Sequence, residues 1–107
     1  MNKLFSMLGI CRKAGKLVLG TDAVAEAAQK QALHLILLTQ DLSRRSREKL
    51  TTVASNTSII VIQAPLTMDE VAALTGKAAG IIGISDKGLA DAVKDIAARM
   101  NEEDTIC

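Results

Sequence analysis

Apolar residues follow two different spacings along the chain, one typical of helices and one typical of buried strands. In the first segment they recur every three or four positions, which predicts an amphipathic helix over residues 2–14. The residues expected to face inward on this helix are Leu4, Met7, Leu8 and Cys11. Gly15 is expected to end the helix, because the left-handed position after a helix favours glycine.

Four short apolar segments are typical of strands. They cover residues 17–19, 33–39, 58–63 and 79–85. The first is the shortest and is expected at an edge of the sheet. The other three are so apolar that both of their faces must be covered, which predicts that all three are buried.

Helices are predicted over residues 21–31, 43–54, 67–74 and 86–100, while residues 101–107 are expected to be frayed. Strands that alternate with helices in this way predict an α/β sandwich with helices on both faces of one central sheet. The length of 107 residues fits one domain, residues 1–107.

Polar residues at the starts of these helices predict side-chain caps. For the helix over residues 21–31 the cap is expected to be Thr21 or Asp22. For the helix over residues 67–74 it is Thr67, with Glu70 as its capping-box partner. The last helix is expected to be capped by Ser85 or Asp86.

The composition is typical of a soluble globular protein, with 49% hydrophobic and 23% charged residues. The longest apolar runs, Leu35–Leu38 and Ile59–Ile62, are far too short to span a membrane, and no signal-peptide cleavage site follows the first helix. A cytoplasmic location is therefore expected. Cys11 and Cys107 lack the spacing of a disulfide framework or a metal site, so both are expected to be free thiols.

The net charge is only +1, but the charges are unevenly distributed. Residues 1–50 carry nine Lys or Arg and four Asp or Glu, whereas residues 51–107 carry four and eight. Such an asymmetry favours a surface with one anion-attracting face, unless folding interleaves the charges.

Little in the sequence suggests catalysis, a cofactor or a metal ion. His34 is the only histidine and is expected to be a packed or half-exposed structural residue. Ser85 and Asp86 lack a neighbouring base, and no glycine-rich phosphate loop occurs, since Gly76 and Lys77 follow a predicted helix. Phe5 is the only aromatic residue, so a nucleic acid would be held by backbone contacts, helix ends and shape and not by base stacking.

Two basic clusters are candidates for phosphate binding. Arg12, Lys13 and Lys16 surround the turn into the first strand. Arg44, with Arg45 and Arg47, begins a helix whose dipole disfavours each cation by roughly 0.3–1 kcal/mol, an effect that a bound phosphate would reverse. The alternative is a solvated face with an Arg44–Glu48 pair.

The segment after the first strand is the third candidate. Gly20 allows close backbone approach, and Thr21 and Asp22 begin a helix whose free N–H groups are suited to a phosphate or a base edge. Simple helix capping is the alternative. Residues 39–41 end the second strand and are expected beside this segment.

Three stretches, LGICRKAGKLVLGTDAV, LHLILLTQDLS and LTGKAAGIIGISDKGLADAV, resemble bacterial members of the L7Ae/L30e ribosomal protein family, the YlxQ-type subgroup in particular. The resemblance covers nearly the whole chain. It implies a three-layer α/β/α sandwich with a four-stranded central mixed sheet, no enzymatic activity, and binding to kink-turn RNA, a sharply bent duplex with sheared G·A pairs.

The resemblance also implies which residues meet the RNA. The junction that reads the G·A pairs would be Gly20, Thr21, Asp22 and Ala23. Gln40 and Asp41 would lie near it. The loop of residues 75–79, which includes Gly76 and Lys77, would pack on bases.

The sequence departs from tight-binding family members at three places. Asp22-Ala23 stands where they have Asn-Glu, and Glu26 stands where they have a lysine. Leu19 stands where many have another lysine. Ionised Asp22 only accepts hydrogen bonds, whereas Asn also donates them.

The leading hypothesis is an RNA-binding protein associated with the ribosome or translation, with structured RNA as its partner and neither DNA nor a membrane expected. Arg12, Lys13, Lys16, Arg44 and Lys77 would hold phosphates. The alternative is a protein-interaction module that kept the fold and lost tight RNA binding. An enzyme or small-anion binder using the same helix start is the third hypothesis.

Overall fold

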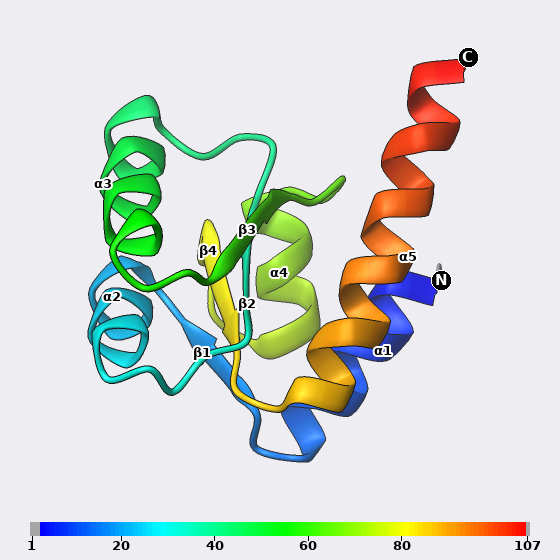
Figure 1. Ribbon diagram of the computed structural model, residues 1–107. Coiled ribbons are helices and arrows are strands. Elements are labelled where there is room, and N and C mark those ends of the chain that lie inside the picture. Colours follow the sequence, from blue (N-terminus) through cyan, green and yellow to red (C-terminus); the bar gives the residue numbers. More distant parts are fainter. Residues whose placement is uncertain (1–2, 107) are drawn as a thin grey trace.

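The computed structural model describes residues 3–106, with side chains described for residues 3–100. Within this range helices and strands alternate (Figure 1). The elements are α1 (Lys3–Lys13), β1 (Leu17–Leu19), α2 (Thr21–Gln29), β2 (Leu35–Leu38), α3 (Arg44–Ser55), β3 (Ile60–Gln63), α4 (Met68–Thr75), β4 (Ile81–Ile84) and α5 (Lys87–Ile106). Residue 2, predicted as the first residue of α1, and Cys107, predicted as a free thiol, lie outside the described residues.

The strands form one mixed sheet in the order β1-β4-β2-β3. The central strand β4 is antiparallel to both of its neighbours, β1 and β2, while β2 and β3 are parallel. Helices α2 and α3 cover one face, and α1, α4 and α5 cover the other (Figure 1). The predicted three-layer α/β/α sandwich with a mixed four-stranded sheet is therefore confirmed.

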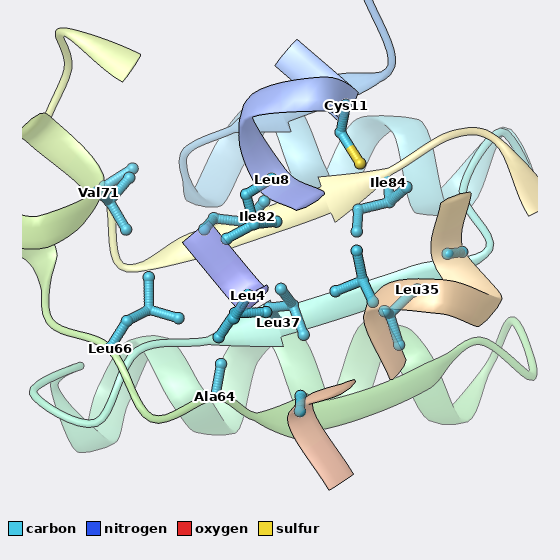
Figure 2. Packing of buried hydrophobic residues seen from close by; sticks show 14 residues of the cluster. Leu4, Leu8, Cys11, Leu35, Leu37, Ala64, Leu66, Val71, Ile82 and Ile84 are labelled. Atoms are coloured by element: carbon cyan, nitrogen blue, oxygen red, sulfur yellow. The ribbon is translucent and has the colours of Figure 1, made fainter. Parts of the chain in front are cut away.

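Alternate residues of the two central strands supply a core on each face of the sheet. Leu35 and Leu37 of β2 face the α1, α4 and α5 side, whereas Ile36 and Leu38 face α2 and α3. Figure 2 shows the first of these cores, where side chains from α1 gather over the sheet. The inward residues Leu4, Leu8 and Cys11 of α1 are fully buried, as predicted, and Met7 is partly buried.

One predicted strand environment is wrong. β3 was expected to be buried, but it lies at an edge of the sheet and is only partly covered, with Ile60 46% exposed. The apolar run of β3 is needed for packing on both faces: Val61 contacts the core under α2 and α3, and Ile62 contacts the opposite core. The predicted edge position of β1 is confirmed.

Several helix ends follow the sequence signals. Gly15, after α1, has a left-handed φ of 72°. Thr67 and Glu70 form the predicted capping box at α4. The Asp86 carboxylate accepts a hydrogen bond from the Leu89 N–H at 2.9 Å, which caps α5.

Two predicted features differ from the structure. Helix α5 continues to Ile106, past its predicted end at residue 100, because no glycine or proline interrupts residues 101–106. His34 precedes β2 and is exposed, so of the two expected environments, packed or half-exposed, the packed one is wrong.

Candidate nucleic-acid interface

Three segments that are distant in the sequence meet where strands β1 and β2 end and strand β4 begins. Because β4 is antiparallel to both β1 and β2, the ends of β1 and β2 lie beside the start of β4. The Gly20 N–H donates to the Ile81 carbonyl at 3.0 Å, and the Thr39 N–H donates to the Gly80 carbonyl at 2.9 Å. We call this region the junction edge and define it as residues 20–23, 39–41 and 76–80.

At the junction edge, helix α2 begins without a side-chain cap. Its N-cap is Gly20, with φ 100° and ψ 155°, a conformation that only glycine adopts without strain. The prediction that Thr21 or Asp22 caps this helix is therefore wrong, because both residues lie inside its first turn. Strand β1 ends at Leu19, as predicted, and the Gly20 N–H still donates to β4, so the helix starts directly after Gly20 and the glycine is the N-cap.

The backbone N–H groups in the first turn of α2 have no hydrogen-bond acceptor among the described residues. These are the N–H groups of Thr21, Asp22 and Ala23. Helices α3, α4 and α5, in contrast, are capped by Ser43, Thr67 and Asp86. The positive end of the α2 dipole therefore meets the surface with its donors available to an anion or a base edge.

The rest of the junction edge is closely packed. A Cβ built on Gly80 would lie 2.5 Å from Leu42 Cδ1 and 2.7 Å from Met68 Cε, so glycine lets the loop before β4 approach the turn after β2. The Thr39 hydroxyl beside Gly80 is buried and has no hydrogen-bond partner among the described residues. This packing fixes the loop of residues 76–80 against the turn of residues 39–41.

Two predicted residues in the turn after β2 differ in their availability. The Asp41 carboxylate accepts hydrogen bonds from the Met68 N–H at 3.1 and 3.3 Å, so it is occupied at the start of α4. The Gln40 N–H donates to the Leu66 carbonyl, and Gln40 itself is exposed. Gly76 and Lys77 are exposed in the loop after α4.

Both acidic residues near the start of α2 are paired with a lysine. Asp22, with its side chain 96% exposed, lies 3.2 Å from Lys49 Nζ of α3. Glu26 lies 2.9 Å from Lys30 Nζ, and its hydrogen bond to Lys30, together with the charge of that lysine, lowers the pKa of Glu26. Lysines thus offset part of the negative charge that the sequence places beside the junction edge.

Lys49 could not be singled out from the sequence. It pairs with a residue 27 positions away, and the contact depends on the packing of α2 against α3. A helix–helix pair of this kind has no fixed sequence spacing, unlike the i,i+4 pairs that α3 also contains.

The first basic cluster lies at the other end of the strands, where β1 begins and β4 ends. The Lys16 carbonyl accepts hydrogen bonds from the backbone N–H and the hydroxyl of Ser85, at the end of β4. Lys16 and Gly20 are separated by β1, which spans about 13 Å between their Cα atoms at about 3.3 Å per residue. Arg12 and Lys13 end α1 and are also exposed there, so the structure does not bring this cluster beside Gly20.

The second basic cluster begins α3. The Arg44 side chain is 91% exposed and forms the predicted i,i+4 pair with Glu48 at 3.0 Å. Ser43 caps this helix through the Ser46 N–H. Because the pair is exposed, it holds Arg44 only weakly.

Among the described residues, no group of three or more His, Cys, Asp or Glu side chains is arranged to hold a metal ion. No helix in the described range combines the length and apolar character needed to cross a bilayer.

Comparison with known proteins gives a consistent result. Residues 2–94 match the model of the ribosomal protein L7Ae/L30e/S12e/Gadd45 family. A solved protein of unknown function from Bacillus halodurans C is similar, with a TM-score of 0.85 and 23% identity over 92% of this chain and 99% of that chain. A 15.5kD RNA binding protein from Giardia lamblia has a TM-score of 0.71 and 9% identity over 92% of this chain and 85% of that one. No curated protein matches the sequence.

Proposed function

The chain belongs to the ribosomal protein L7Ae/L30e/S12e/Gadd45 family, and from this we propose that it is an RNA-binding protein without enzymatic activity. Its RNA would be a kink-turn or a similarly bent structured RNA, recognised at the junction edge. We further propose that it is a YlxQ-type bacterial member that acts as one cytoplasmic domain, associated with the ribosome or translation. The similarity in fold to an RNA binding protein from Giardia lamblia supports the choice of RNA as the partner.

The uncapped start of α2 is the observation that carries this proposal. Three N–H donors and the positive end of the helix dipole meet the surface beside Gly20, which has no side chain to obstruct a ligand. The loop of residues 76–80 and the turn of residues 39–41 flank these donors. In this proposal a sharply bent duplex would contact all three segments together.

The proposed phosphate contacts fall into two groups. Lys77 belongs to the junction edge, and Arg44 begins α3 shortly after the turn of residues 39–41. The second group lies at the other end of β1 and consists of Arg12, Lys13 and Lys16. These residues would contact only an RNA that continues past β1 for about 13 Å or more. Thr21, Asp22, Ala23 and Gln40 would face the bases.

Binding of a kink-turn RNA should be compared with binding of a straight duplex of equal length, at two salt concentrations. We expect the kink-turn to bind more tightly at both. Because phosphate contacts release counterions, both affinities should fall with salt, but the preference should persist. Equal affinities would leave only nonspecific charge attraction and would favour the protein-interaction alternative.

A matched pair of variants tests the α2 donors directly. Thr21→Pro removes one N–H at the first helical position, where proline fits the helix, and Thr21→Ala removes only the side chain. Loss of a hydrogen bond to a charged group costs about 1.5–3 kcal/mol, so Thr21→Pro should weaken kink-turn binding by about tenfold or more relative to Thr21→Ala. Equal affinities of two folded variants would show that this donor does not contact the RNA.

A further inference from the structure

A groove of about 620 Å³ lies between α1 and α4, on the face of the sheet opposite α2 and α3. Phe5, Gly9 and Ile10 of α1 line it on one side, and Leu74 of α4 lines it on the other. None of these residues belongs to the junction edge. The groove is therefore a surface that the proposed RNA site does not account for.

The groove exposes apolar side chains. Ile10 is 51% exposed and, with Ile60, is one of the two large hydrophobic residues that are strongly exposed in the described part of the chain. Phe5 is partly buried and packs at the margin of the core under α1. Ile10, Phe5 and Leu74 together give the groove an apolar lining, and an apolar patch with polar residues around it is typical of a surface that binds another protein.

Gly9 stands in the middle of α1, where a glycine costs the helix about 0.5–1 kcal/mol relative to alanine. The fold offers no compensation for this cost, because a Cβ built on Gly9 would meet no atom within 4 Å. Because Gly9 has no side chain, another backbone or side chain is able to approach α1 closely within the groove.

The free charge at the groove is positive. Arg12 and Lys13 line its end, and both are exposed. The Arg12 guanidinium reaches the Leu74 carbonyl only at 3.5 Å, and Lys13 has no ion-pair partner among the described residues. The one acidic residue of the lining, Glu70, accepts a hydrogen bond from the Thr67 N–H at 2.9 Å, so the lining carries two positive charges and one negative charge.

We propose that this groove binds an acidic amphipathic helix of a partner protein. An apolar side chain of that helix would pass over Gly9 and contact Ile10 and Leu74, while its carboxylates would meet Arg12 and Lys13. An RNA strand would satisfy the two cations, but its backbone has no apolar face to cover Ile10. The groove shares no residue with the junction edge, so an RNA confined to that edge would leave the groove free, whereas an RNA that reached Arg12 and Lys13 would compete with the partner helix.

The test is a selection from a displayed library of sixteen-residue helical peptides with randomised surfaces. Peptides are selected on the full-length protein and depleted on its Gly9→Leu variant, which adds a side chain to the groove and whose Cβ would meet no atom within 4 Å. Thermal unfolding confirms that the variant is folded. We expect the enriched peptides to share apolar residues at helical spacing and an excess of Asp and Glu. A lack of enrichment, or enriched peptides without this acidic character, would overturn the proposal.

The enriched peptide then serves as a probe in binding measurements. Gly9→Leu and the double variant Arg12→Glu/Lys13→Glu should each weaken its binding at least about tenfold, because one fills the groove and the other reverses its charge. The matched control, Lys87→Glu/Lys94→Glu on α5, should leave the affinity within about twofold. A control that weakens binding equally, or a peptide affinity that neither Gly9→Leu nor the charge reversal changes, would show that the groove is not the peptide site.

Discussion

Replacing Asp22 by asparagine should strengthen kink-turn binding, because it removes a negative charge from the first turn of α2 and restores a donor. A phosphate held by the N–H groups of that turn would lie roughly 6 Å from the Asp22 carboxylate, about one helical pitch. Since the side chain is 96% exposed, the dielectric constant of water applies. The repulsion is then about 0.7 kcal/mol, or about threefold in affinity.

The pairing with Lys49 does not cancel this effect. An exposed pair at 3.2 Å contributes about 0–1 kcal/mol to stability, so the variant should remain folded with a nearly unchanged melting temperature. It also leaves Lys49 available to a phosphate. The loss of the Asp22 carboxylate raises the net charge of this surface by one, whether or not RNA is bound.

Affinity for a fluorescent kink-turn RNA should be measured by anisotropy at two salt concentrations. The gain should be about threefold at low salt and below about twofold at 0.15 M, where the Debye length is about 8 Å. The matched control is Asp95→Asn, which removes an exposed carboxylate paired with Arg99 on α5. An unchanged or weaker affinity for Asp22→Asn, or an equal gain for Asp95→Asn, would refute the proposed placement of the RNA.

Three predictions concern the fold itself. Gly83→Val should destabilise the protein by about 1–3 kcal/mol in urea unfolding, because a Cβ there lies 2.7 Å from buried Leu33; an unchanged midpoint would contradict this packing. Thr67→Ala should cost about 1 kcal/mol through loss of its capping box with Glu70, and an effect near zero would show that the cap is not needed. Burial raises the pKa of the Cys11 thiol, so in a Cys107→Ser background the folded protein should react slowly with iodoacetamide. Its stability should fall as the pH rises above about 9, because the thiol of the unfolded chain ionises first. Fast alkylation would contradict the burial.

The sequence predicted the type and order of every helix and strand, because each is short and has a clear apolar period or a local cap. It did not predict which strands are central and which lie at an edge, because that depends on the order of the strands in the sheet. The runs Leu35–Leu38 and Ile59–Ile62 are equally apolar, yet β2 is central and β3 is at an edge. Their difference comes from the insertion of β4 between β1 and β2, and strand composition carries no information about that insertion.

The candidate site shows the same limit. Gly20, Thr21 and Asp22 were predicted from their residues and Ala23 from the family resemblance, and the topology brings the predicted turn and loop beside them. Arg12 and Lys13 were grouped with these residues because they are close in sequence, but β1 lies between them and Gly20, so they are at the other end of the strand. Lys49 was missed because its contact with Asp22 depends on how two helices pack.

The position of β4 has a consequence for folding during synthesis. β1 and β2 are both made early, but each pairs with β4, and the pairing of Leu17 with Ile84 joins residues 67 positions apart. Until β4 leaves the ribosome, β1 has no partner in the sheet, and only the parallel pair β2 and β3 is able to form. A nascent chain arrested before residue 81 should therefore remain protease-sensitive through its amino-terminal third, and protection there should arise in one step when the last strand emerges.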